Sequence, residues 1–267
     1  MSNQALFDFI PSVEGRIRHE LRSRCETFTP DFKNPEVFCV ITALLARQAT
    51  LAIDHISSPI TWTAHSAPLF LRAMADVHIS LAWILLNPET HAQLYIEYGL
   101  GQATLELERR KKQLEVEEDD ELRENQEQVV QTLEKWIDAQ KWHFLVTVDV
   151  GAWSGKNTRQ MADEAKILDF YNYVYTPFSS CVHSTWFHVA RCNSEPSGSP
   201  FTMLLRKPNI PVLQPDAKYM TLAAKYLDKT FNLFDEKVLN REPVSEIQVW
   251  IRGEIKRCFG DKSEPPQ

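Results

Sequence analysis

Glycine is scarce in this sequence, with only 8 residues in a chain of 267. An all-β fold with many tight turns needs glycine where the backbone takes positive φ angles. Its scarcity therefore favours helices. Hydrophobic residues make up 43% and charged residues 24% of the chain, a composition that argues against wholesale disorder.

Paired cysteines and the usual cofactor motifs are also missing. The five cysteines are Cys25, Cys39, Cys181, Cys192 and Cys258. An odd number without C-x-x-C spacing suggests neither a disulfide framework nor a zinc ribbon, so we expect small buried residues in a reducing cytosol. The sequence has no glycine-rich phosphate loop and no Glu-x-x-His motif of a di-metal bundle, and Glu97, His65 and His91 are scattered. We therefore expect no metal and no cofactor.

The chain has no excess of positive charge and no long apolar run. Its net charge is −7, so a broad electrostatic grip on nucleic acid is not expected, although a local basic patch would still allow RNA contact. The N-terminal residues lack the basic and apolar regions of a signal peptide. The longest apolar candidate, 79–86, contains Ser80 and falls short of the roughly 18 residues of a spanning helix. We expect a cytoplasmic protein with no membrane partner.

Apolar spacing and helix-breaking residues predict an all-α fold. It is expected to be a multi-helix bundle with a charged helical hairpin and two C-terminal helices, in a single domain, 1–260, followed by a disordered tail, 261–267. The expected helices span about 12–28, 35–56, 66–86, 88–115, 158–168, 216–240 and 243–259, with the hairpin tip at 115–140, a loop at 141–157 and an irregular crossing at 194–215. The dense charge at the tip is typical of a solvated hairpin rather than a binding tail.

One expected helix, 66–86, is apolar nearly all round, which marks a central core helix. Arg72 and Asp76 are four residues apart in it, and because burying either charge alone is costly we expect them to pair. The pair is either a structural ion pair or an anion site in which Asp76 orients Arg72. His78 follows Arg72 with five residues between them, a spacing typical of HEPN-type helical ribonucleases, although six positions along a helix separate the two side chains by about 120°.

A second candidate lies in the late segment FYNYVYTPFSSCVHSTWFHVARCN. Ser179 and His183 are four residues apart and share a helix face, and Tyr175 extends that face by another turn. Pro177 either kinks one continuous helix or starts a new one, in which case Tyr175 leaves the face. His183 is either a catalytic group or a core histidine bonded to Ser179 or to a backbone carbonyl. His188 falls about 140° from His183, so the two are not a natural metal pair.

In four segments the chain resembles a bacterial family catalogued as domain of unknown function 5677. They are LRAMADVHISLAWILLNP, LYIEYGLGQ, WSGKNTRQMADEA and YNYVYTPFSSCVH, within about residues 35–192. The resemblance implies an all-helical domain related to HEPN-like proteins and often associated with bacterial defence or toxin–antitoxin contexts. It carries over Arg72, Asp76, Tyr175, Ser179 and His183 as site residues. Asp76 departs from the glutamate usual in the family, and Pro177 is a further departure.

Three functions remain open from the sequence. The first is a metal-independent ribonuclease, in which Arg72 holds the phosphate, Asp76 orients Arg72, and His183 or His78 is the general acid–base, oriented by hydroxyl groups. HEPN sites are usually composite, which implies a homodimer by analogy. The second is a non-catalytic helical binding or regulatory module, in which these residues form a polar network that fixes helix packing. The third is a nucleotide or anion pocket clamped by Arg72. An open cleft where His183 meets Arg72 favours chemistry, and a sealed one favours architecture.

Overall fold

The computed structural model describes residues 3–144, 154–197 and 206–259. Most of these residues are helical, and the sheet they contain is a small two-stranded one. The predicted all-α multi-helix fold is therefore confirmed. The expected tail, 261–267, and the middle of the expected loop, 141–157, lie outside the described residues.

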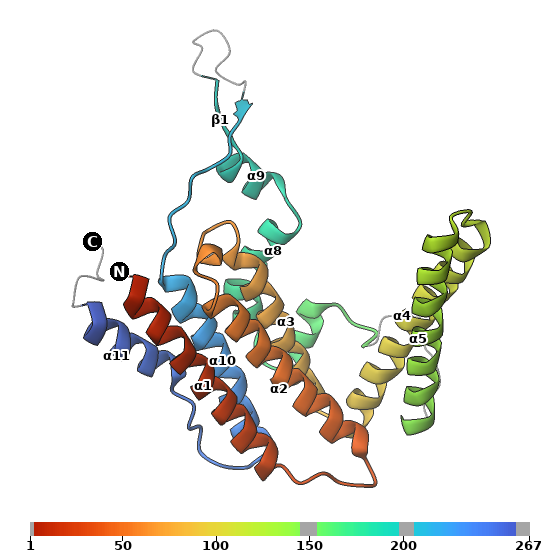
Figure 1. The fold of residues 1–267 in the computed structure, drawn as a ribbon. Coiled ribbons are helices and arrows are strands. Elements are labelled where there is room, and N and C mark those ends of the chain that lie inside the picture. Colours follow the sequence, from red (N-terminus) through yellow and green to blue (C-terminus); the bar gives the residue numbers. More distant parts are fainter. Residues whose placement is uncertain (1–2, 145–153, 198–205, 260–267) are drawn as a thin grey trace.

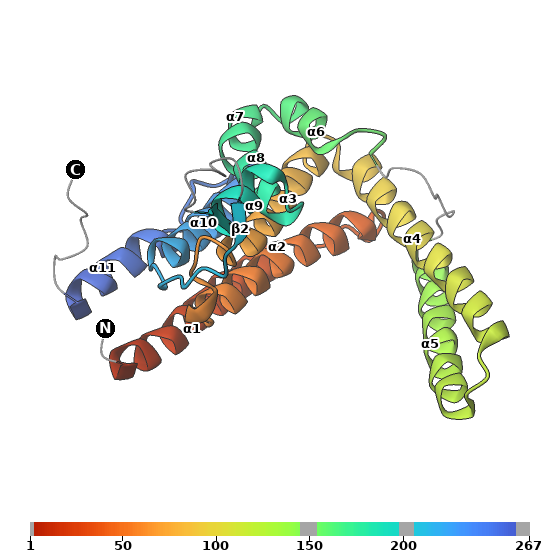
Figure 2. The ribbon, with the colours of Figure 1, turned by 90° about the horizontal axis from the view of Figure 1, so that it is seen from above.

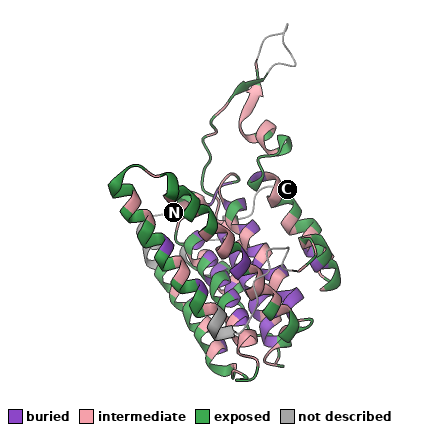
Figure 3. Cartoon of the chain, turned by 90° about the vertical axis from the view of Figure 1, so that its right-hand side faces the viewer, coloured by how far each residue is buried: buried purple, intermediate pink, exposed green. Residues whose placement is uncertain are grey.

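A bundle of helices forms the body of the molecule (Figures 1 and 2). Its long members are α1 (Asn3–Thr27), α2 (Pro35–Ile56), α3 (Ala67–Ile84), α10 (Lys218–Lys237) and α11 (Ile247–Phe259). α3 is central because it packs against both α2 and α10, while α1 packs on α2 and α11 on α10. Leu71, Ile79, Leu81 and Ile84 lie on several sides of α3 and are all fully buried, as Figure 3 shows for the interior of the bundle. The expected core helix is confirmed.

The first helix is longer than the sequence predicts. α1 begins at the third residue rather than near Ser12, and it runs through Pro11. The Ser12 hydroxyl donates to the carbonyl of Phe9 at 2.6 Å instead of capping a helix start. Phe9, Val13 and Ile17 are buried at four-residue spacing, so packing against the bundle extends the helix past its proline.

The two predicted C-terminal helices are confirmed, and a side chain of the first holds the start of the second. Asp228 on α10 accepts hydrogen bonds from the backbone N–H groups of Ile247 at 2.9 Å and Gln248 at 2.8 Å. Its carboxylate also accepts from the Ser245 hydroxyl at 2.7 Å. Since the first N–H groups of a helix have no partners within it, Asp228 caps α11 from outside.

A helical hairpin projects from the bundle (Figures 1 and 2). It consists of α4 (Pro88–Val116) and α5 (Asp120–Phe144), which pack along one another, and we call it the arm. Val130 and Ile137 on α5 are buried. The predicted charged hairpin is confirmed, but α5 runs to residue 144 and so takes the first residues of the expected loop.

Short elements cover the side of α3. They are α6 (Thr158–Glu164), α7 (Leu168–Phe170), the π-helical turn η2 (Tyr171–Tyr175), α8 (Thr176–Val182) and α9 (Trp186–Cys192), while η1 (Pro59–Thr61) occupies the expected break after α2. The helix expected at 158–168 ends earlier because Lys166 adopts φ 60°. The Ile167 N–H then donates to the carbonyl of Ala162 at 2.8 Å, which closes a Schellman cap.

The crossing expected to be irregular, 194–215, contains regular structure. β1 (Ser194–Pro196) pairs antiparallel with β2 (Arg206–Pro208), with Glu195 opposite Lys207. An ion pair between Lys207 and Glu195 at 3.0 Å supports the pairing. This small hairpin continues from α9 and stands away from the bundle in Figure 1.

Two bundle helices, α2 and α3, are long and apolar enough to cross a membrane by length and composition alone. Composition therefore does not exclude a span, contrary to the expectation from the sequence. Core helices pass the same test, and 72% of the apolar window of α3 is buried against its neighbours, compared with 44% for α2. The composition of α3 is accounted for by its central position in the bundle.

Candidate functional site

Arg72 lies on the side of α3 that faces the short elements, and its guanidinium group pairs with a carboxylate there. The side chain is 9% exposed, and its Nη1 donates to the Asp76 carboxylate one turn later. The ring of Tyr175 covers the guanidinium group, with 3.2 Å between Arg72 Cζ and the ring centroid. The predicted pairing of Arg72 with Asp76 is confirmed, and Tyr175 joins the pair from η2.

The position of Tyr175 follows from the π-helical turn. The Thr176 N–H bonds to the carbonyl of Tyr171, five residues back, so the chain stays helical across Pro177 instead of starting afresh. The wider turn stacks the rings of Tyr171 and Tyr175, whose centroids are 4.7 Å apart. The Tyr175 hydroxyl donates to Thr158 Oγ1 at 3.2 Å. Of the two alternatives for Pro177, the structure has the continuous helix with a distortion.

These contacts join two elements, η2 and α6, to α3. We call Arg72, Asp76, Tyr171, Tyr175 and Thr158 the Arg72 cluster. Burial raises the pKa of the Tyr175 phenol, which keeps it protonated as a hydrogen-bond donor. The positive charge of Arg72 is neutralised by Asp76 and covered by an aromatic face, so it is not presented to solvent as an anion clamp.

A second set of contacts lies nearby and involves the W-S-G-K segment. Gly155 adopts φ 62°, a value that favours glycine, and the turn it makes leads Lys156 to Glu164 on α6 at 2.6 Å. Glu164 accepts from Trp83 Nε1 on α3 at 2.7 Å. The Trp83 ring in turn stacks on His91 of α4, with centroids 3.6 Å apart. The segment thus contributes to the attachment of α6 to the core.

Ser179 lies in α8, and His183 follows directly after its last residue. The helix ends at Val182, His183 is its C-cap, and Ser184 adopts φ 47°. The Thr185 N–H donates to the carbonyl of Ser180 at 3.0 Å, which closes a second Schellman cap. His183 is exposed while Ser179 is half-buried. The His183 N–H still donates to the carbonyl of Ser179 at 3.0 Å, so the two residues keep their helical spacing. Within the described residues no side-chain hydrogen bond joins His183 to Ser179 or to Arg72.

His78 lies in the interior rather than beside Arg72. It is 2% exposed, and its Nδ1 lies 3.1 Å from Thr230 Oγ1. The Thr230 hydroxyl donates to the carbonyl of Tyr226, so Nδ1–H of His78 is the donor in their contact. Burial, with a smaller effect of Lys229, lowers the pKa of His78 to about 3. His78 is therefore a neutral packing residue at neutral pH.

The sequence did not predict that one group of three side chains lies close together in the structure. His65, His188 and Cys192 converge between the loop before α3 and helix α9. A signal was present in part, because His188 and Cys192 are four residues apart and share a helix face. The third member is more than 120 positions away, and no local pattern indicates that contact.

The fold and the Arg72 cluster define an all-helical protein in which a buried arginine ties short helices to a core helix. The sequence matches the family described as "Family of unknown function (DUF5677)" over residues 38–200, more than half of the chain. The chain belongs to this family. Comparisons with curated proteins and with solved structures found no match. The matched region contains the whole Arg72 cluster and the W-S-G-K segment.

Proposed function

We propose that this protein is a non-catalytic helical interaction module that self-associates through its arm. The observation that carries the proposal is an exposed apolar stripe on α5. Leu122, Val129 and Trp136 are 52%, 44% and 48% exposed and stand seven residues apart. Seven-residue apolar spacing on a helix is the pattern of a helix–helix seam.

The stripe is separate from the face that already holds the arm together. Val130 and Ile137, at 7% and 2% exposure, are enclosed on the inner side of α5. On the outer side, Val129 and Trp136 line a groove of about 660 Å³ between α4 and α5. A helix that projects from a bundle with a second apolar face is suited to packing against another helix.

The charge on the groove favours a second copy of the chain over RNA. Its acidic and basic residues, Glu106 and Arg110, pair with each other at 2.7 Å. The remaining polar lining is uncharged: Asn125, Gln128 and Thr132. Two such surfaces meet without like-charge repulsion, whereas RNA would need an excess of positive charge.

The dimensions of the arm suit a stable dimer. Its helix α5 has 25 residues, which corresponds to a length of about 38 Å, and two helices side by side are about 20 Å wide. That face is on the scale of the about 800 Å² per partner that specific interfaces bury. Two arms pairing along it would form a four-helix bundle.

The Arg72 cluster has a structural role in this proposal. Its contacts hold α6 and η2 against α3, and the close cover of Tyr175 argues against an open phosphate site. The guanidinium group of Arg72 is paired with Asp76 and covered by Tyr175, and this arrangement does not support an anion pocket built on Arg72.

Trp136→Glu tests the proposal in sedimentation or light-scattering measurements. We expect a dimer for the wild-type chain and a monomer for Trp136→Glu. Val249→Glu is the matched control, because Val249 on α11 is 64% exposed and lies outside the arm, and it should remain dimeric. A wild-type monomer, or a dimer unaffected by Trp136→Glu, would overturn the proposal.

A metal-independent ribonuclease of HEPN-like type is the second candidate. The exposure of His183 favours it, because the histidine ends a helix that packs on α3, where Arg72 lies. For catalysis Tyr175 would have to move off Arg72. RNA cleavage by the wild-type chain that disappears in His183→Ala would establish this function, and equal or absent cleavage by both proteins would exclude it.

A further inference from the structure

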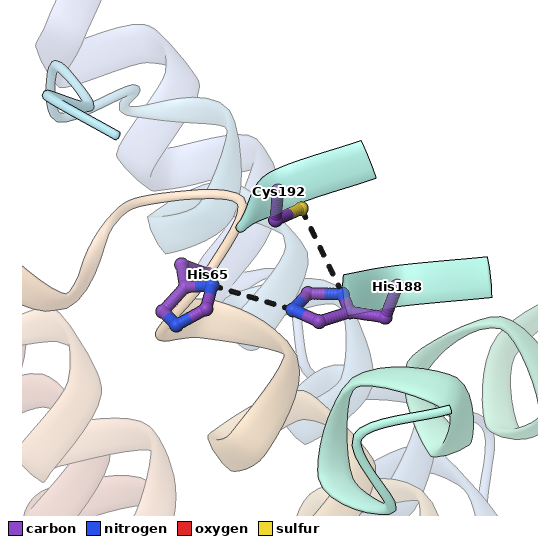
Figure 4. A group of neighbouring side chains, drawn as sticks. All are labelled: His65, His188 and Cys192. Atoms are coloured by element: carbon purple, nitrogen blue, oxygen red, sulfur yellow. Dashed lines mark hydrogen bonds between the residues drawn. The ribbon is translucent and has the colours of Figure 1, made fainter. Parts of the chain in front are cut away.

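His65, His188 and Cys192 form a compact group at the junction of the bundle and α9 (Figure 4). His65 Nδ1 lies 3.3 Å from His188 Nε2, and His188 Nδ1 lies 3.9 Å from Cys192 Sγ. One ligand atom from each residue can be chosen so that all three lie within 4.8 Å of one another. The two imidazole rings stack, with centroids 5.2 Å apart.

Both the spacing and the chemistry of this group suit zinc. Zn²⁺ binds imidazole nitrogen at about 2.0–2.1 Å and thiolate sulfur at about 2.3 Å in tetrahedral geometry, so its ligand atoms stand roughly 3.3–3.6 Å apart. The distance between the histidine nitrogens already has this value. Cys192 Sγ lies nearest the other ring nitrogen of His188, Nδ1, so side-chain rotation is needed to bring the sulfur and His188 Nε2 to one ion, and both side chains start from the same α9 face.

The backbone around His65 is held by its own contacts. Thr63 Oγ1 accepts from the N–H groups of His65 and Ser66, which shapes the turn before α3. Cys181 on α8 donates its thiol hydrogen to the carbonyl of His65 at 3.3 Å. One ligand is thus carried by a fixed turn, and two are carried by one helix.

We propose that His65, His188 and Cys192 bind a Zn²⁺ ion, with water in the fourth position. Three protein ligands and a water are the pattern of a zinc site with an open position, and the ion would here also hold α9 in place. Among the described elements, α9 has its main contacts with its chain neighbours α8 and β1. A metal bridge from His65 to α9 would fasten α9, and the β1–β2 hairpin that follows it, to the bundle.

The test is a Zn²⁺ titration of the apo protein, with Co²⁺ as a spectroscopic probe of thiolate ligation. We expect one ion per chain and a thiolate-to-cobalt charge-transfer band. Cys192→Ser should remove the band, and both Cys192→Ser and His188→Ala should weaken binding by at least about 10-fold. Zn²⁺ should also raise the melting temperature of the wild-type chain and not that of the variants.

Two control variants keep the test specific. His183→Ala removes an exposed histidine outside the group, and Cys39→Ser removes a cysteine on α2, so both should bind as the wild type does. Circular dichroism of the apo forms of Cys192→Ser and His188→Ala checks folding, which substitutions on the short peripheral helix α9 should preserve. Binding unchanged in Cys192→Ser and His188→Ala, or no stoichiometric Zn²⁺ in the wild type, would overturn the proposal and leave a hydrogen-bonded His–His–Cys chain.

Discussion

The guanidinium group of Arg72 lies over the ring of Tyr175, with 3.2 Å between Cζ and the ring centroid, and it pairs with Asp76 one turn along α3. An arginine held on both sides is suited to fixing helices and poorly suited to receiving a phosphate. The contact favours the interpretation of Arg72 and Asp76 as part of a structural network over that of an anion site, whereas the sequence pattern alone is compatible with both.

Removal of Arg72 should therefore act on stability. Arg72→Ala is expected to lower the free energy of unfolding by about 1–3 kcal/mol, since it removes a buried arginine, its ion pair with the 46% exposed Asp76 and its contact with the Tyr175 ring. Tyr175→Phe keeps the ring and loses only the hydrogen bond to Thr158, so it should cost about 1 kcal/mol. Urea unfolding measures both. A loss below about 0.5 kcal/mol for Arg72→Ala would contradict the structural role.

Stability should fall on mild acidification. Burial lowers the pKa of His78 to about 3 and that of His55 to about 4, both below the ordinary histidine value of 6.5. Between those values and 6.5 the unfolded chain binds more protons, so the contribution is complete above about pH 6.5 and is lost as the pH falls. Each histidine should cost about 2 kcal/mol between pH 7 and pH 5.

The variant His78→Gln separates the two histidines. It removes one titrating group, so its loss of stability between pH 7 and pH 5 should be about 2 kcal/mol smaller than that of the wild type. Urea unfolding at the two pH values gives this difference directly. An unchanged pH dependence would mean that His78 is protonated in the folded protein, contrary to its buried position.

Loss of the cap on α11 should loosen the C-terminal helix. Asp228→Ala is expected to cost about 1–2 kcal/mol, because the first N–H groups of α11 lose their acceptor. Amide hydrogen exchange should become faster in α11 of this variant than in α11 of the wild-type chain, and the increase should be larger in α11 than in α3. Glu242→Ala, at an exposed position in the same connection, is the control and should leave exchange in α11 unchanged.

The sequence carries enough information for the helices and for the pairing within α3. Apolar periodicity and prolines in first turns place α2, α3 and α4 close to their observed positions, as at Pro35 and Pro88. The partnership of Arg72 and Asp76 follows from four-residue spacing in an apolar helix, because an isolated charge there would be costly.

Other features depend on backbone conformations that the local sequence does not predict. Lys166 and Ser184 end α6 and α8 in the left-handed region, where glycine or asparagine is usual. The π-helical turn at Tyr171–Tyr175 and the contact of His65 with His188 arise from tertiary packing. The local spacing behind the expected Ser179/His183 face and the expected absence of a metal contains none of these contacts, and both expectations stay predictions.

Self-association through the arm is the central claim, and opposite charges at one position test it most directly. Val129→Glu and Val129→Lys chains should each sediment as monomers, because each pairing would place like charges in the same apolar seam. An equimolar mixture should form a dimer that weakens at high salt, since the two stripes meet across a two-fold axis. A mixture that stays monomeric while the wild type is dimeric, or single variants that remain dimers, would contradict the account.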